Sequence, residues 1–310
     1  MTTSTTLNSP RSRHRFGAHL SIAGGLHHAL EAAANLGFDS VQIFVKNQQQ
    51  WSASPLSDEQ ARLFRRTQRL TGVRPVIAHA SYLPNLASPD STARSRSIAA
   101  IVDELERCEA LAVRHLVLHP GSHLGEGLDQ GLRTVAASLD EIHRRTAGFA
   151  ARLLLETTAG QGNSVGHEPW QLGRIIQQVA EPRRVGVCLD TCHLFAAGYN
   201  LADPADYARL MSELAAEIGL ARIKCIHMND SKTPCGSRVD RHEHIGKGRL
   251  GLRAFAHVVN DPRLTLAPKI LETPKGVTPR GIDLDKLNLR RLRGLVRPSP
   301  RSSPVRDART

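Results

Sequence analysis

The sequence predicts a single-domain (β/α)8 barrel, also called a TIM barrel. Eight short apolar runs, rich in Val, Ile and Leu and with little polar alternation, recur along the 310 residues. Such runs are typical of strands that are buried on both faces of a parallel sheet. Each run is followed by a helical pattern or a long loop, which is the order that a barrel requires. The expected strands are residues 17–22, 40–45, 74–80, 115–120, 152–157, 185–190, 223–230 and 268–273.

Helical patterns lie between several of these runs. Residues 24–36 and 90–112 carry apolar side chains at helical spacing. Asp203 followed by Pro204 is typical of a helix start, because aspartate caps the first amides and proline fits the first turn. Leucines along residues 283–295 predict a final amphipathic helix that docks on the barrel.

An open, doubly wound sheet is the competing arrangement. Its usual dinucleotide site needs the glycine pattern G-x-G-x-x-G after a strand, whereas this chain has GGLHHAL at residues 24–30. A Walker A motif is absent from the sequence as well. Both observations favour the closed barrel over a nucleotide-binding open sheet.

Composition excludes several classes of protein. Hydrophobic residues make up 40% of the chain and charged residues 23%, which is typical of a globular protein. The mean hydropathy is −0.28, and no apolar run is long enough to span a bilayer, so a membrane protein is not expected. The sequence begins without the apolar segment of a secretory signal, and an odd set of five cysteines predicts reduced thiols in a cytoplasmic protein.

The net charge of +12 is concentrated at the two ends of the chain. Residues 1–15 hold three arginines and no acid, and residues 290–310 hold seven arginines against one aspartate. We expect a disordered basic extension at 1–14, a barrel domain at 15–296 and a disordered Arg/Ser/Pro-rich tail at 297–310. One hypothesis is that the tail binds DNA without specificity, in which case its deletion should flatten the salt dependence of DNA affinity.

Side chains that can take part in catalysis or bind metal lie at the ends of the predicted strands. Six successive apolar runs each finish with a side chain that can bind a metal ion. In a barrel these ends meet at one rim, where six such side chains would converge. A single polar side chain at a strand end is usually a satisfied cap, but six together would be costly to bury without compensating cations. The six are His79, His119, Glu156, Asp190, His227 and Glu272.

Three further residues extend this set. His193 lies three positions after Asp190, and Asp240 and His242 form an Asp-x-His pair in the loop after the seventh run. Imidazoles together with carboxylates favour Zn²⁺, with Mn²⁺ or Fe²⁺ as alternatives. Nine ligands are too many for one ion and fit two or three if a carboxylate bridges. A cluster of that kind is suited to phosphoester hydrolysis.

For several other features of the sequence, an ordinary structural role is as well supported as a functional one. The loop KNQQQW at residues 46–51 combines amides, a cation and an aromatic ring, as nucleic-acid-binding loops do. Tyr82 and Leu83 follow His79 and could wedge into a base stack. Cys188 alternates within an apolar run, so we expect it to pack in the core rather than to bind zinc.

Several long motifs resemble those of the endonuclease IV family, the zinc-dependent apurinic/apyrimidinic (AP) endonucleases of DNA base-excision repair. They include GAHLSIAGGL, KNQQQW, HASYLPNL, LVLHPGSH, ETTAGQGNSVG, GVCLDTCHLFAAGYNL, HMNDSKTPCGSRVDRHEHIGKGRLG and LETP. The matching stretches extend from residue 17 to residue 274 and cover nearly the whole body of the chain.

The resemblance implies a TIM barrel that holds three zinc ions on nine ligands. Its first zinc would take His79, His119 and the bridging Glu156, and its second Glu156, Asp190, His227 and Glu272. The third would take His193, Asp240 and His242. All nine positions hold the residue type that the family pattern requires.

The resemblance also implies the reaction. Duplex DNA carrying a base-less nucleotide would be bent, and water activated at the metal site would attack the phosphate on the 5′ side of the lesion. The products would be a 3′-hydroxyl and a 5′-deoxyribose phosphate. Glu156, which would bridge two ions and orient the nucleophile, and Glu272 would be the catalytic carboxylates. The family precedent is a monomer without an obligate protein partner.

Two positions depart from the family pattern. Gln49 stands where the family often has arginine in a DNA-inserting loop, and Lys247 stands where it often has glutamate. Loss of the arginine would weaken the hold on DNA or change the preferred lesion. The expected DNA contacts are Lys46, Asn47, Gln49, Tyr82 and Leu83.

Two other functions compete with this one. A sugar isomerase or epimerase of the xylose-isomerase-like barrels would share the fold, but it would leave His193 and the Asp240-x-His242 pair without a role. A zinc-loaded DNA-binding protein without catalytic activity would not need six converging strand ends.

Overall fold

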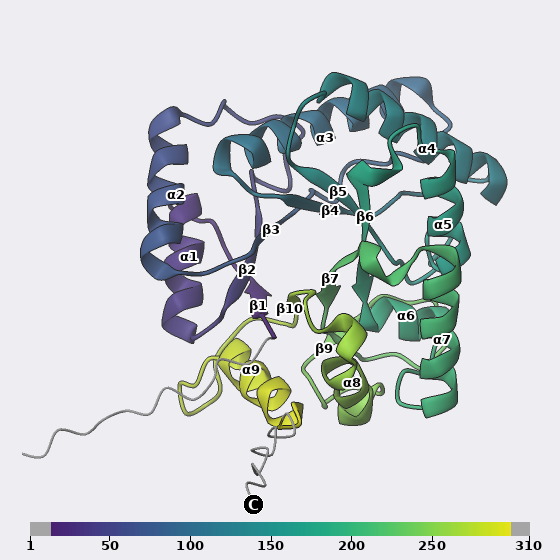
Figure 1. Cartoon of the computed structure of the whole chain (residues 1–310). Coiled ribbons are helices and arrows are strands. Elements are labelled where there is room, and N and C mark those ends of the chain that lie inside the picture. Colours follow the sequence, from purple (N-terminus) through teal and green to yellow (C-terminus); the bar gives the residue numbers. More distant parts are fainter. Residues whose placement is uncertain (1–13, 299–310) are drawn as a thin grey trace, which may run out of the picture.

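The computed structural model describes residues 14–298, and in it eight parallel strands close into a barrel ringed by helices (Figure 1). The strands follow one another around the barrel in chain order, and β10 closes it between β7 and β1. They are β1 (Phe16–His19), β2 (Ser40–Phe44), β3 (Val76–His79), β4 (His115–Leu118), β5 (Arg152–Glu156), β6 (Val185–Asp190), β7 (Ile223–His227) and β10 (Lys269–Leu271). The predicted TIM barrel is confirmed, and the open sheet is excluded.

Seven of the eight expected runs contain one barrel strand each, within the predicted limits or one residue outside them. The eighth, residues 223–230, was predicted too long, because the chain leaves the barrel after His227. Asp230 and Ser231 form β8 (Asp230–Ser231), which pairs in antiparallel fashion with β9 (His242–Glu243) outside the barrel. The expected extensions at 1–14 and 297–310 lie almost wholly outside the described residues, and the tail hypothesis stays a prediction.

The helices begin and end where local residues dictate. Ser57 and Gln60 form a capping box at the start of α2, and the side chains of Asp90, Asp203 and Asp283 cap α3, α7 and α9. The bounds are α1 (Leu26–Leu36), α2 (Asp58–Thr71), α3 (Ser91–Leu111), α4 (Leu128–Arg145), α5 (Pro169–Gln178), α6 (Thr191–Ala197), α7 (Pro204–Glu217), α8 (Gly251–Asn260) and α9 (Leu284–Leu295). All four predicted helices are present.

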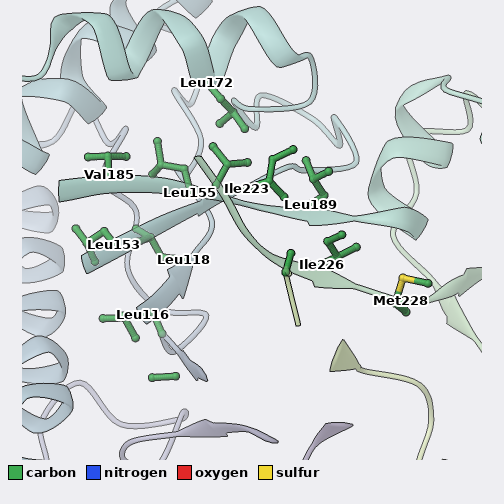
Figure 2. Close-up of a cluster of buried hydrophobic side chains, with 14 of the residues drawn as sticks. Leu116, Leu118, Leu153, Leu155, Leu172, Val185, Leu189, Ile223, Ile226 and Met228 are labelled. Carbon is green, nitrogen blue, oxygen red and sulfur yellow. The ribbon is translucent and has the colours of Figure 1, made fainter. Parts of the chain in front are cut away.

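Side chains alternate between two cores along the strands. Outward-facing residues pack against the helices, as Figure 2 shows for Leu153 and Leu155 of β5 and for Leu172, which reaches them from α5. Inward-facing residues form a small separate layer that fills the barrel. Its members are Ile77, Val117, Leu154, Cys188, Cys225 and Ile270. The expected core position of Cys188 is confirmed.

The inner layer explains where the predicted metal ligands lie. Each of its six residues is followed two positions later by one of the six strand-end candidates, and residues i and i+2 of a strand face the same side. The two remaining strands supply Gly17 and Gln42 at the interior. No helix within residues 14–298 is long and apolar enough to cross a membrane.

Candidate metal centre

Glu156 lies at the middle of the cup that the strand ends form. Its side chain is fully buried, and its two oxygens approach four imidazoles from four different elements. Oε2 is 3.1 Å from Nε2 of His79 and 3.1 Å from Nε2 of His119. Oε1 is 2.8 Å from Nδ1 of His227 and 3.4 Å from Nδ1 of His193. One carboxylate therefore faces ligand atoms on both of its edges, as a bridging ligand must.

A second group of donors lies beside the first. The loop after β7 brings Asp240 to 3.1 Å from Nε2 of His193 and to 3.2 Å from Nε2 of His242. Nε2 of His242 is also 3.7 Å from Asp190, which ends β6. On the opposite side, Glu272 lies 3.1 Å from Nδ1 of His227. All nine candidate ligands from the sequence thus gather in one cup.

Main-chain carbonyl oxygens orient three of the five imidazoles. A carbonyl oxygen can only accept a hydrogen bond, so the ring nitrogen that faces it carries the proton. Nδ1 of His79 donates to the Ala80 oxygen at 2.7 Å, and Nδ1 of His193 donates to the Thr157 oxygen at 2.8 Å. Nδ1 of His242 donates to the Glu272 main-chain oxygen at 3.2 Å. Each ring then presents its unprotonated nitrogen to the cup, which is the state that binds a metal.

His227 is oriented in a similar way, but its two ring nitrogens have exchanged roles. Its Nε2 donates to Oε1 of Gln42 at 2.8 Å, so Nδ1 is left to face the cup. The amide nitrogen of Gln42 donates in turn to Oε1 of Glu272 at 2.6 Å. Gln42 is fully buried and therefore holds two predicted ligands in place at once. Sequence reasoning missed it, and the only signal was one polar residue inside an apolar run.

Asn229 performs a matching role on the other side. Its amide nitrogen donates to Oδ2 of Asp190 at 2.7 Å, and its amide oxygen accepts from the main chain of Glu272 at 2.8 Å. His19 also touches the cup, with Nδ1 3.4 Å from Oε1 of Glu272. The sequence analysis did not single out Asn229.

Electrostatics shifts the pKa values of these groups in opposite directions. Burial disfavours ionisation of Glu156, but His227 and His119 outweigh it and hold the pKa of this carboxyl well below its usual value. Burial likewise disfavours protonation of His242, yet Asp190 and Asp240 raise its pKa to about 9. Glu156 is thus ionised, and His242 takes up a proton readily, so that a proton occupies a position that a metal ion would take.

Two orphaned nitrogens show that the residues fit a metal. Nε2 of His193 and Nε2 of His242 are buried and have no hydrogen-bond partner, although oxygens of Asp240 are within 3.2 Å of both. Donor atoms that lie this close without hydrogen-bond geometry are arranged as ligands around a common ion. The mixture of imidazole and carboxylate suits zinc and its neighbours in the first transition series.

Tyr82 divides the approach to the cup into two cavities. Its ring is 65% exposed and lies 5.8 Å from that of Phe44. A cavity of about 750 Å³ on one side is lined by His19, Asn47 and Glu272, among others. A cavity of about 290 Å³ on the other side is lined by Leu83, His119, His193 and Asp240, among others. A substrate chain that passes Tyr82 can therefore reach the ligands from either side.

The other residues expected to contact DNA differ in their exposure to solvent. Asn47 and Gln49 are exposed and Leu83 is half-buried, so each is open to a ligand. Lys46, in contrast, is buried, and its ammonium is 2.8 Å from Asp103 and 3.5 Å from Glu104. In this conformation the ammonium of Lys46 is thus paired inside the protein, and its contact with DNA stays a prediction. Lys247 is exposed.

Comparison with known proteins agrees with this geometry. Residues 30–292 match the family model described as "Xylose isomerase-like TIM barrel". A "Probable endonuclease 4" of Chloroflexus aurantiacus is 48% identical over 282 residues, which cover 91% of this chain and 98% of the relative. The chain belongs to the endonuclease IV family. It is a metal-dependent nuclease, and its substrate is DNA.

Solved structures support the same assignment. Endonuclease IV from Thermus thermophilus superposes with a TM-score of 0.80 at 36% identity, covering 91% of this chain and 98% of that one. A D-tagatose 3-epimerase-like protein superposes with a TM-score of 0.68, but at 19% identity it shows the fold alone. The sugar isomerase alternative is therefore not supported, and a DNA-binding protein without catalysis is not supported either.

Proposed function

We propose that this endonuclease acts on abasic sites in duplex DNA. It would hydrolyse the phosphodiester bond on the 5′ side of the lesion and leave a 3′-hydroxyl and a 5′-deoxyribose phosphate. The observation that carries the proposal is the position of Glu156, whose two oxygens face four imidazoles at the floor of a cup flanked by open cavities. A substrate with an exposed sugar–phosphate backbone can enter such a cup, whereas a fully stacked duplex cannot.

The proposed cofactor is three Zn²⁺ ions per chain. One set of ligands is His79, His119 and Glu156, a second is Glu156, Asp190, His227 and Glu272, and a third is His193, Asp240 and His242. When bound, such ions lower the pKa of water and neutralise charge on a phosphate. The contacts among the nine side chains support this division, since Glu156 touches members of every set. Metal analysis of the purified protein would test identity and number, with Mn²⁺ or Fe²⁺ as the alternatives.

The remaining steps belong to the protein's own residues. Glu156 orients the attacking water, and Glu272, held by Gln42 and close to His19, faces the larger cavity where the phosphate enters. Tyr82 lines both cavities and Leu83 the smaller one, and these two side chains occupy the space that a missing base leaves in the stack. Asn47 and Gln49 contact the neighbouring backbone from the exposed loop.

A nicking assay tests the reaction directly. The substrate is an end-labelled duplex with one stable abasic analogue, and the protein is used with and without prior treatment with 1,10-phenanthroline. We expect a single nick on the 5′ side of the lesion, a product that a DNA polymerase can extend, and loss of both after chelation. Equal nicking of an undamaged duplex, or a nick on the 3′ side, would contradict the proposal.

We further propose that the enzyme works as a monomer in the cytoplasm. Its cup is complete within one chain, because all nine ligands come from the same protomer. Sedimentation of the metal-loaded protein alone and with an abasic duplex would test the first point, and a second protomer in the complex would contradict it. Cell fractionation would test the location.

A further inference from the structure

The amino end of the barrel, opposite the cup, contains a further cavity with several basic residues in its lining. Its volume is about 420 Å³, which lies in the range of small-molecule sites. The first residues of β4, β5 and β6 and the second residue of β7 line it, with Arg183 and Arg222 beside them. β5 has five residues, so the two ends of the barrel are roughly 13 Å apart along this strand. The inner apolar layer lies between the two sites.

The charged residues that line this cavity are all basic, and they stand among apolar residues and glycines. The lining includes His115, Arg152, Arg183, Arg222 and Lys224, and no acidic residue is among the lining residues. The guanidinium of Arg222 is fixed, because it donates to the main-chain oxygens of Pro182 and Val185. A fixed cation at the wall and several movable ones around it form a cradle for an anion.

Four of these side chains have no partner within the protein. In the part of the chain that the structure describes, His115, Arg152, Arg183 and Lys224 make no side-chain hydrogen bond or ion pair. Gly186 also lines the cavity, and a Cβ there would come within 2.7 Å of Leu154 and 3.1 Å of the Arg222 main-chain oxygen, so only glycine fits at this point of the wall. Arg152, Arg183 and Lys224 are exposed to solvent. Like charges gathered around one cavity repel one another, and a bound anion would reduce this repulsion.

The state of His115 supports the same picture. Burial, together with Lys224, Arg152 and Arg114, lowers the pKa of its imidazole to about 4. The ring is therefore neutral at physiological pH, and it can donate one hydrogen bond to a ligand while the surrounding cations supply the charge. This arrangement suits a ligand that carries several negative charges on oxygen atoms.

We infer that this amino-end cavity binds a small anion with two linked phosphate groups. Guanidinium groups pair with phosphate in a bidentate manner, and three arginines with one lysine exceed what a single carboxylate would need. The cavity is too small for a DNA duplex and lies at the opposite end from the nuclease cup. The same diphosphate chemistry is found in free pyrophosphate and in a nucleoside diphosphate.

Calorimetric titration of the metal-loaded protein tests the inference. The probe is inorganic pyrophosphate in excess Mg²⁺, so that it does not strip metal from the cup. The test variant combines Arg152→Ala with Lys224→Ala, both at exposed positions. The control combines Arg62→Ala with Arg66→Ala, which removes the same charge from the exposed face of α2. Thermal unfolding of each variant verifies that it is folded.

We expect affinity for pyrophosphate to fall tenfold or more in the test variant, on the order expected for two charge-assisted contacts, and to stay unchanged in the control. Hydrogen exchange at the amino ends of β4 to β7 should slow on binding in the wild-type protein only. Equal affinity in all three proteins would overturn the inference, because the probe would then bind at the cup or at the basic ends of the chain. A parallel titration with ADP distinguishes the two sources. Tighter binding of ADP than of pyrophosphate would indicate that the ligand is a nucleotide. Binding of pyrophosphate alone would indicate that the ligand is the free anion.

Discussion

The two ends of the barrel differ in charge although the same strands build both. Two positions after the inner apolar layer, Glu156 and Asp190 converge with histidines at the carboxyl end. Two positions before the same layer, His115 and Arg152 face the amino end, where Lys224 joins them. One end has carboxylates and imidazoles in mutual contact, and the other has four basic side chains that make no hydrogen bond or ion pair within residues 14–298.

Histidine behaves in opposite ways at the two ends. In the cup, carboxylates overcome burial and raise the pKa of His242 to about 9. At the amino end, burial and neighbouring cations lower the pKa of His115 to about 4, and burial and Arg184 lower that of His143, in the last turn of α4, to about 4. The fold brings side chains together, but the charges on the neighbouring groups decide whether an imidazole takes up a proton or stays neutral.

The largest expected effect is at the centre of the cup. Glu156→Gln should lower the rate of abasic-site nicking by about a thousandfold or more, because the amide removes one negative charge and a bridging oxygen from four imidazoles. Single-turnover kinetics and metal content measure the effect. Glu126→Gln, in an exposed loop, is the control and should behave as the wild type. Near-normal nicking by the Glu156 variant would exclude the proposed bridge.

A smaller effect is expected from a residue that positions two ligands. Gln42→Leu should lower activity and metal affinity together by roughly 10- to 100-fold, since His227 and Glu272 both lose a hydrogen bond. Metal affinity is measured by competition with a chelator. Ser40→Ala is the matched control, because Ser40 lies on the same strand but bonds to the Pro75 oxygen at the amino end. If both variants lose metal equally, Gln42 supports the fold and not the site.

A moderate effect on substrate binding is expected at the rim. Tyr82→Ala should weaken binding of an abasic duplex by about tenfold, because the exposed ring can no longer stack beside the lesion. Fluorescence anisotropy measures the affinity, and the metal content should not change. Leu70→Ala, which removes an exposed apolar side chain from α2, is the control. Unchanged affinity for the abasic duplex would remove Tyr82 from the proposed contacts.

The smallest effect concerns stability at the amino end. His143 is buried and neither of its ring nitrogens has a hydrogen-bond partner in the described part of the chain. Its pKa is about 4 in the folded protein against 6.5 ordinarily, so the unfolded chain binds the proton first and folding stability falls as pH drops from 6.5 towards 4. His143→Leu should reduce this loss by on the order of 1 kcal/mol at pH 5. Urea unfolding at pH 5 and pH 7.5 provides the comparison, and parallel pH curves for both proteins would contradict the prediction.

Much of the site was predictable because parallel strands impose a simple rule. When His79, His119 and Glu156 each end an apolar run, closure of the barrel brings them to one rim. Asp240 and His242 were predictable only beside that set, since their loop has no periodicity of its own. Residues 228–230 were wrongly included in the seventh strand, because the point where the chain leaves the barrel depends on contacts with other segments and has no signal of its own in the sequence.

Gln42, Asn229 and Lys46 show what a pattern of residue types leaves open. Gln42 and Asn229 matter because their amides reach Glu272 and Asp190 across the cup, and these partners are distant in sequence. Lys46 belongs to a loop that suggests DNA contact, yet Asp103 on α3 holds its ammonium inside the protein. In each case the partner, and not the residue itself, determines the role.

The sequence by itself determined the barrel, the nine candidate ligands and the family, because strand periodicity and strand-end residues are local properties of the chain. Only the tertiary structure decided which imidazole nitrogen faces the cup, which amides hold the carboxylates, and that the amino end gathers unpaired cations. These features depend on pairs of side chains from different strands. Their distances are set by the closure of the barrel and cannot be obtained from spacing along the chain.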